Sequence, residues 1–442
     1  MRKIALILCL ALLAGAVGCG NTENEEVKVT PTVTPSETSV PKPSETLEAV
    51  IDKTVDLMEN VKTEKAEKTE ITKEFLTAQN DFAINLLKTQ YKSGENTMVS
   101  PVSAMLALAM TANGAKGQTL KEMENVLGSG IVIDDLDRYL RAYTDSLETD
   151  EKYKMHIANS IWFSDNADMI RVKEDFLKTN GKYFNAEIYK APFDETTLKD
   201  VNNWVNTHTE EMIPSILEKV EKSDVMYLIN AIAFDAEWRE IYDEEHIYDG
   251  EFINAAGRAE TVKMLASEER VFLKDKNAKG FMKPYAGGYA FVALLPDEGV
   301  SIDEYVASLD KEKLTELFGN KIYKKVRTRM PSFETECSFN LNEGLIEMGM
   351  PTAFDCIRAD FGNMAEDDGN GNICIDRVIQ KTYIKVDERG TKAGAATLVA
   401  MVKNSAALED FEEVFLDRPF VYMIVDTAND LPLFLGVECS VK

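Results

Sequence analysis

Residues 388–401 read ERGTKAGAATLVAM, a run in which small residues dominate. With the period of two that a β-strand imposes, one face carries side chains that a sheet could bury: Thr391, Ala393, Ala395, Thr397, Val399 and Met401. The other face carries Lys392, Gly394, Ala396, Leu398 and Ala400. The alanine content also favours a helix on propensity alone. The residues themselves leave both interpretations open.

The sequence around this run indicates one large domain. Phe75, Phe82 and Leu86 recur at helical spacing, and Ser100-Pro101 is a natural helix start. Strands are predicted where β-branched and aromatic residues gather, at 227–234, 289–295, 420–425 and 433–437, the last two forming a hairpin. Residues 404–413, after the alanine-rich run, are polar and acidic, as in an exposed loop. We therefore expect a mixed α/β domain over residues 71–442, with mostly antiparallel pairing.

Composition and motifs argue against several classes of function. A formal net charge of −27 repels phosphate backbones, so nucleic acid is not an expected partner. The three histidines, His156, His208 and His246, do not neighbour a plausible nucleophile, and hydrolase, zincin and phosphate-loop motifs are absent. We expect no enzymatic activity and no cofactor.

A metal site is not expected either. The run 367–372 (DDGNGN) invites a calcium interpretation, but an EF-hand loop starting at Asp368 would need glycine at its sixth position, where Ile373 stands. The Asn-Gly and Asp-Gly pairs predict a hairpin turn instead. The downstream cysteines, Cys337, Cys356, Cys374 and Cys439, form no C-x-x-C pair. We expect buried thiols, with one disulfide among them left open.

The N-terminus has the pattern of an export signal. Basic residues precede an apolar run that ends at Val17-Gly18-Cys19, which resembles a bacterial lipobox. We predict a lipoprotein signal peptide over residues 1–18, lipid attachment at Cys19, and a disordered, charged tether over 19–70. The protein is then an extracytoplasmic, membrane-anchored, cell-surface lipoprotein. The alternative is an ordinary cleavage after Ala14-Gly15-Ala16 and free secretion.

Seven separated segments, taken together, are similar to the serpin family of protease inhibitors. They are residues 96–103 (NTMVSPVS), 114–119 (GAKGQT), 159–163 (NSIWF), 203–213 (NWVNTHTEEMI), 230–238 (NAIAFDAEW), 294–298 (LLPDE) and 417–436 (DRPF to FLG). They occur in the family's order and cover nearly all of 71–442. The resemblance implies an α+β fold with three mostly antiparallel β-sheets, eight or nine helices and an exposed reactive-centre loop at about 388–416.

The resemblance also assigns the alanine-rich run. It implies that Glu388 to Thr397 is the hinge of the reactive-centre loop, with Thr391 the first inward-facing residue; the residues carried over are Glu388, Gly390, Thr391, Ala393, Ala395, Ala396 and Thr397. In the family, a protease cleaves the loop to form an acyl-enzyme, and the cut loop inserts as a strand into the main sheet before water can release the enzyme. Lys392, where the family commonly has glutamate, should face outward.

Further residues follow from the same resemblance. The family's shutter and related structural positions correspond to Asn96, Ser100, Pro101, Ser103, Asn230 and Gln380. Gln380 stands where the family has a histidine. The family's spacing puts the reactive bond between Asn404 and Ser405, but the loop is longer than in many relatives, and Met401, Lys403, Ala406 and Leu408 remain alternatives.

The resemblance implies a monomeric suicide-substrate inhibitor whose partner is a serine (or cysteine) endopeptidase. The competing interpretation is a non-inhibitory family member that acts as a surface carrier or chaperone-like binding module. Such members usually carry bulky, charged or proline residues in the hinge, whereas the inward positions here are small. The sequence favours inhibition.

Overall fold

The computed structural model describes residues 54–147, 149–165, 170–366, 373–391 and 411–442, all within the compact unit Ala49–Lys442. The helices in these ranges are α1 (Lys73–Gln90), α2 (Pro101–Ala112), α3 (Gly117–Gly128), α4 (Ile133–Ser146), α5 (Glu174–Phe184), α6 (Glu195–His208), α7 (Ile302–Ser308), α8 (Lys311–Gly319) and α9 (Asn342–Met348), with 3-10 turns η1 (Glu244–His246) and η2 (Pro351–Phe354).

Three sheets accompany the helices. In spatial order, the first is β1 (Val55–Asp56), β5 (Glu187–Ala191), β3 (Tyr153–Ser164), β6 (Met226–Glu237), β15 (Gly390–Thr391), β14 (Arg377–Val386) and β12 (Phe333–Asn340). The second is β16 (Glu412–Phe415), β11 (Ile322–Pro331), β8 (Ala259–Lys274), β9 (Ala278–Pro284), β10 (Tyr289–Pro296), β17 (Phe420–Asp426), β18 (Leu431–Glu438) and β2 (Thr97–Val99), with β7 (Ile247–Ile253) on β8. A short pair joins β13 (Ala365–Glu366) to β4 (Arg171–Val172). The predicted α+β fold with three sheets is confirmed.

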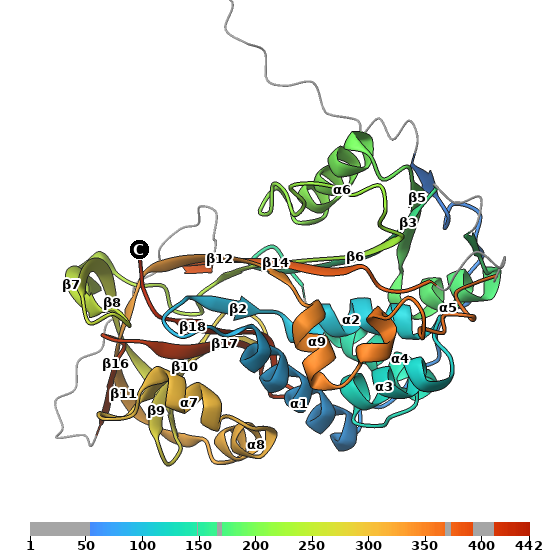
Figure 1. Cartoon of the computed structure of the whole chain (residues 1–442). Helices are drawn as coiled ribbons and strands as arrows, with labels where there is room; N and C mark the ends of the chain where they lie inside the picture. Colours follow the sequence, from blue (N-terminus) through green and yellow to red (C-terminus); the bar gives the residue numbers. More distant parts are fainter. Residues whose placement is uncertain (1–53, 148, 166–169, 367–372, 392–410) are drawn as a thin grey trace, which may run out of the picture. The chain divides into compact units, whose positions relative to one another are not determined.

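Strand β6 lies in the middle of the first sheet and is covered on both faces. Figure 1 shows α6 on one face of this sheet and α2 on the other. A strand enclosed in this way reads as a nearly continuous apolar run, and the first nine residues of β6 are all buried. Helix α2 is buried along its whole length, as expected for a helix that is apolar on every side.

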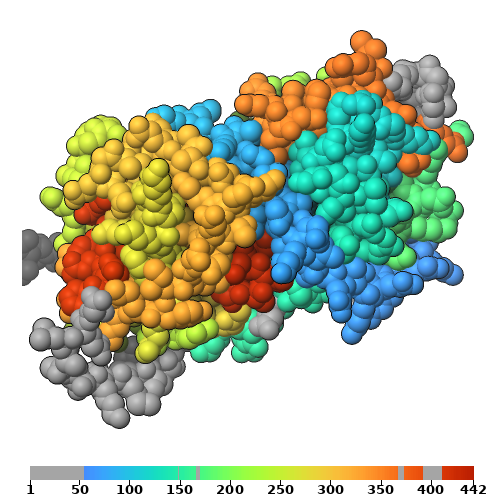
Figure 2. Space-filling model, turned by 90° about the horizontal axis from the view of Figure 1, so that it is seen from below, coloured from blue at the N-terminus to red at the C-terminus, as the bar shows by residue number. Residues whose placement is uncertain are grey.

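The predicted N-terminal helix is α1. Its N-cap, Thr72, accepts a hydrogen bond from the Phe75 amide at 3.2 Å, and Phe75, Phe82 and Leu86 are buried. Figure 2 shows α1 in blue, between α3 and α4 in teal and the α7–α8 segment in yellow-orange. The apolar stripe read from the sequence is therefore the face of α1 that closes the core.

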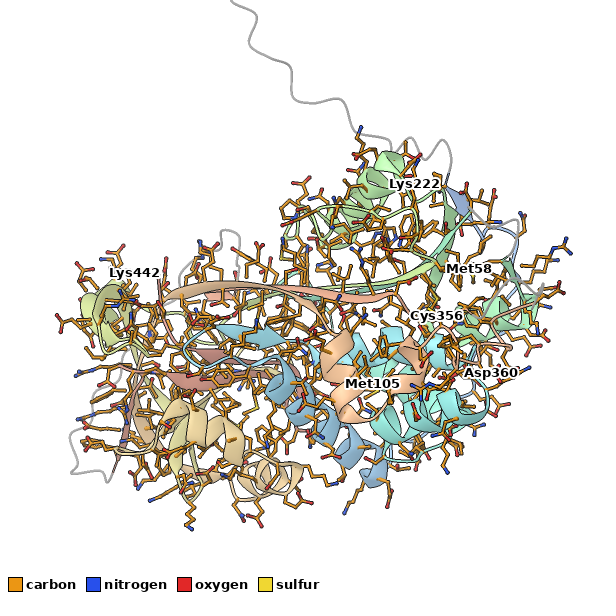
Figure 3. All side chains as sticks on the ribbon, in the orientation of Figure 1. Met58, Met105, Lys222, Cys356, Asp360 and Lys442 are labelled. Atoms are coloured by element: carbon orange, nitrogen blue, oxygen red, sulfur yellow. A yellow bond between two sulfur atoms is a disulfide. The ribbon has the colours of Figure 1, made fainter. Side chains whose placement is uncertain are left out.

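The chain packs on the domain before residue 71. Strand β1 pairs with β5 in the register Val55↔Lys190, and the Thr54 hydroxyl donates to Asp200 at 2.7 Å. Met58, labelled in Figure 3, and Thr63 lie against Gly181 of α5, where a Cβ would come within 2.3 Å of Thr63. Residues 54–70, predicted as part of the tether, thus include a strand of the main sheet. No helix in the described ranges is long and apolar enough to span a membrane.

Candidate functional site

The site is the junction between β6 and β14, where residues 388–391 enter the first sheet. Strand β15 lies between the two strands at one end of the junction, with Thr391 opposite Ala236 of β6 and Val386 of β14. Beyond β15 the two strands pair directly and in parallel, from Arg377↔Tyr227 to Thr382↔Ile232. The junction is therefore occupied by β15 at one end and closed by direct pairing from Arg377 to Thr382.

Gly390 and Thr391 are buried parts of the sheet, which differs from the expectation of an exposed loop from residue 388. A Cβ at Gly390 would lie 2.0 Å from the Ala236 carbonyl oxygen, so the close approach of the two backbones requires glycine. The Thr391 side chain is 1% exposed, and its hydroxyl lies 2.5 Å from the hydroxyl of Tyr285. Gly390 and Thr391 fit between β6 and β14 because both residues are small.

The residues before β15 are held by backbone hydrogen bonds. The Trp238 amide donates to the Arg389 carbonyl at 2.9 Å, and the Tyr242 amide donates to the Glu388 carbonyl at 3.0 Å. The Trp238 ring stacks on Tyr285 with centroids 4.3 Å apart. Of these anchors, Tyr285 was not found from the sequence, because its role depends on a contact across 106 residues that no local pattern encodes.

Gln380 lies at the centre of a buried polar cluster in the closed part of the junction. Its amide nitrogen donates to the Ser100 carbonyl and to Asn230 Oδ1, both at 2.9 Å, and its oxygen accepts from the Ser100 amide at 3.0 Å. Asn230 in turn donates to the Ser103 carbonyl at 2.7 Å and to Asn159 at 2.5 Å. Glutamine can donate and accept at once, so it links β14, β6 and the start of α2.

Two residues grouped with this cluster from the sequence have different surroundings. Pro101 is the first residue of α2, where its missing N–H has no helical partner to lose. Asn96 accepts from the Cys439 and Ser440 amides at 2.7 and 2.9 Å and donates to the Glu438 carboxylate at 2.9 Å. Asn96 therefore fixes the end of β18 rather than the β6–β14 junction.

The remaining predicted site residues lie outside the described ranges. They are Cys19 of the lipobox, the turn at 367–372, Lys392 and the hinge positions Ala393, Ala395, Ala396 and Thr397, and the candidates for the reactive bond, Met401, Lys403, Asn404, Ser405, Ala406 and Leu408. The chain re-enters the described ranges at Phe411 and forms β16, which pairs in parallel with β11.

The cysteines correct one expectation. Cys356 and Cys374 form a disulfide, whereas Cys337 and Cys439 are buried free thiols. The Asp376 carboxylate lies within 4.8 Å of both bridged sulfurs. Because the sulfurs are bonded to each other and Asp376 accepts backbone hydrogen bonds, this group offers no free set of metal ligands. The pairing was not predictable because it depends on how residues 18 positions apart fold back together.

A charged cluster joins α6 to the edge of the sheet. The two ring nitrogens of His208 face acceptors, the Trp204 carbonyl at 2.7 Å and the Glu187 carboxylate at 2.8 Å. The bond to Glu187 raises the pKa of His208, although burial opposes it. Burial disfavours the Glu187 charge, but hydrogen bonds from His208, Tyr189 and Trp204 outweigh it and lower the pKa of Glu187 to about 2. The imidazolium form fits both acceptors, so the cluster is an ion pair.

Comparison with known proteins agrees with this geometry. The family model described as Serpin (serine protease inhibitor) matches residues 77–440. The chain belongs to the serpin family. Serpin B6 of Macaca fascicularis is 29% identical over 374 residues, covering 81% of this chain and 97% of that protein. Leukocyte elastase inhibitor A of Mus musculus is 28% identical over 376 residues, with the same shares covered.

Solved structures of a thermophilic serpin, tengpin, are also similar. The native state superposes with a TM-score of 0.84 at 42% identity and covers 88% of this chain and all of that one. The latent state gives 0.76 at 43% identity, covering 85% of this chain and all of that one. The higher score with the native state accords with the direct pairing of β6 and β14 in this serpin.

Proposed function

We propose that this serpin is a suicide-substrate inhibitor of a serine or cysteine endopeptidase, and not itself an enzyme. The protease nucleophile attacks a peptide carbonyl in the loop that follows Thr391, the amine end of the cut bond departs, and an acyl-enzyme remains. The freed segment then inserts between β6 and β14 and carries the acylated protease with it before water hydrolyses the ester or thioester.

The observation that supports the proposal is the state of the β6–β14 junction. Gly390 and Thr391 already lie between the two strands, paired with Ala236 and Val386, so the next residues can extend an existing strand. Addition of a strand satisfies backbone N–H and C=O groups that an exposed loop leaves to solvent. The small side chains at the inward positions after Thr391 suit that passage.

The test is incubation with a panel of serine and cysteine proteases, followed by a denaturing gel. A covalent serpin–protease complex that survives denaturation is the expected result. Cleavage of the chain by every protease, without any such complex, would contradict the proposal and favour the carrier or binding-module alternative. Mass spectrometry of the released C-terminal fragment identifies the reactive bond and decides between Asn404–Ser405 and the other candidates.

We also propose that the protein acts outside the cytoplasm as a monomer anchored to the membrane through a lipid on Cys19. The lipobox-like Val17-Gly18-Cys19 supports this. Replacement of Cys19 with alanine should move the protein to the soluble fraction and abolish labelling with a fatty-acid analogue. Unchanged fractionation and no labelling of the wild type would favour free secretion.

A further inference from the structure

The closed end of the β6–β14 junction is joined by a carboxylate. Asp376, the residue before β14, accepts hydrogen bonds from the backbone amides of Val225 and Met226 at 2.6 and 3.0 Å. These amides belong to the residues at the start of β6. A carboxylate that accepts from backbone N–H groups makes charge-assisted hydrogen bonds, which are roughly twice as strong as neutral ones. Asp376 therefore bridges the two strands where their pairing begins.

An ion pair reinforces this bridge. The Arg377 guanidinium lies 3.0 Å from the Asp224 carboxylate, and the two side chains are 24% and 14% exposed. The same guanidinium lies over the Tyr227 ring, 5.4 Å from its centroid, and the Tyr227 hydroxyl donates to Asp224. Both contacts of Arg377 join the start of β14 to the start of β6 or to the residues before it, and the Tyr227 hydroxyl helps to hold Asp224 in place.

Asp376 and the residues just before it are also held by contacts that do not involve β6. Its carbonyl accepts from Asn342 of α9 at 2.6 Å, and the Ile375 amide donates to the Ala353 carbonyl at 3.0 Å. Two residues earlier, Cys374 is covalently bonded to Cys356, which is labelled in Figure 3. If β6 and β14 separate at this end, the bonds from Asp376 to Val225 and Met226 must break.

The register of β15 shows when that separation is needed. Gly390 lies opposite Glu237 and Thr391 opposite Ala236, in antiparallel pairing. If the following residues continue this register, Thr397 comes opposite Asn230 and Val402 opposite Val225. Partial insertion therefore leaves the Asp376 bridge intact. Insertion up to the predicted reactive bond at Asn404 breaks it.

We propose that Asp376 is a positioning residue that keeps this end of the junction closed in the native protein. Its bridge to β6 breaks only as loop insertion is completed. The proposal rests on the proposed inhibitory function. The bridge stabilises the native state but not the fully inserted state. Its removal should therefore lower the free-energy cost of completing loop insertion. The same bridge would hold the sheet closed against spontaneous insertion of the uncut loop.

The test compares melting midpoints of intact protein with those of protein nicked once between residues 403 and 410 by a subtilisin-type protease, the cut verified by mass spectrometry. Asp376→Ala should lower the midpoint of the intact form by a few degrees and leave the nicked form unchanged. Asp376→Asn, which keeps an acceptor oxygen without the charge, should give a smaller shift in the same direction. If Asp376→Ala does not fold, the comparison is made with Asp376→Asn alone.

Glu336→Gln is the matched control. Glu336 of β12 lies 2.7 Å from Lys381 of β14, and this pair crosses a strand boundary that insertion does not open. Any shift it causes should be equal in the intact and nicked forms. With a protease that forms the covalent complex, Asp376→Asn should also lower the number of inhibitor molecules consumed per protease trapped, whereas Glu336→Gln should not change it.

The outcomes separate this inference from the proposed function. If nicking fails to raise the melting midpoint of the wild type, the inhibitory function itself is wrong. If nicking raises it but the Asp376 variants lower the intact and nicked forms equally, Asp376 is an ordinary structural residue and only this inference is overturned. The same conclusion follows if the Asp376 variants change neither form.

Discussion

Thr391→Arg is the substitution that tests the hinge most directly. Thr391 is 1% exposed, and its hydroxyl lies 2.5 Å from that of Tyr285, so an arginine side chain finds neither space nor a carboxylate at this position in the sheet. The hinge of the variant is expected to leave the sheet in the native protein. Insertion after cleavage must then bury a guanidinium without a partner, at a cost of several kcal/mol even after relaxation.

The effect on inhibition follows from the competition between insertion and deacylation. If about 3 kcal/mol of the burial cost falls on the insertion barrier, insertion slows by about a hundredfold, since about 1.36 kcal/mol is a factor of ten. Deacylation occurs in the protease active site and should keep its rate. The ratio of released to trapped protease should therefore rise by about a hundredfold, and the variant should be consumed as a substrate cut at the same bond.

The assay is the stoichiometry of inhibition, measured by titrating a protease that forms the covalent complex with wild type. Thr391→Ser keeps the hydroxyl for Tyr285 and should trap the protease about as well as wild type. Lys392→Glu, at a position predicted to face outward, should do the same. If Thr391→Arg still traps its protease one-to-one, the assignment of residues 388–397 as the hinge is refuted.

Three further substitutions address stability. Removing the Cys356–Cys374 disulfide by double serine substitution should lower the free energy of unfolding by about 3 kcal/mol, because the bond closes an 18-residue separation; denaturant titrations with and without reductant check this. Burial raises the pKa of Asp137, so ionisation of this carboxyl above its unfolded pKa costs stability; Asp137→Asn should raise the melting midpoint more at pH 8 than at pH 4. The hydrogen bond to Glu187 raises the pKa of His208, so the ion pair stabilises the fold fully at pH below the unfolded histidine pKa, and this stabilisation is lost as pH rises through the folded-state pKa. His208→Gln should therefore lower the melting midpoint more at pH 5.5 than at pH 9.

Local patterns in the sequence were sufficient for many elements. The apolar runs at 227–234, 289–295 and 420–425 are β6, β10 and β17, because strands covered on both faces must be apolar along their length. The helical spacing of Phe75 and Leu86 gave α1. The strand interpretation of the alanine-rich run, which propensity left open, is tested only for Gly390 and Thr391, and these two residues are β15.

Long-range pairing could not be read in the same way. Nothing near residue 377 in the sequence shows that β14 runs parallel to β6, because the choice of partner is made by the whole fold. The same holds for Asp376, whose two donors lie about 150 residues earlier. Residues 54–58 were assigned to a tether because they lie within a charged stretch, residues 45–73. Strand β1 nevertheless adds to the edge of β5 through backbone hydrogen bonds, which any sequence without proline can make.

The polarity of the β6–β14 junction has a physical reason within the proposed mechanism. Asn230, Gln380 and Thr382 are fully buried in the two strands that insertion must separate. In the closed state each has partners: Gln380 bonds Ser100 and Asn230, and the Thr382 hydroxyl donates to the Met98 carbonyl at 2.8 Å. Opening the junction without a new strand would leave buried groups unpaired at about 1–3 kcal/mol each, which opposes spontaneous opening. A strand that enters can offer new partners to the groups it separates, so the same residues oppose an empty gap and tolerate a filled one. An apolar junction would not make this distinction, because its packing resists separation without requiring new hydrogen-bond partners.

We therefore expect Gln380→Leu to fold, to stay closed through packing, and to lose the hydrogen bonds that link Ser100 to Asn230. Its stoichiometry of inhibition should be worse than that of Gln380→His, which keeps a donor and an acceptor. Equal stoichiometries for the two variants would show that the polar cluster has no part in insertion.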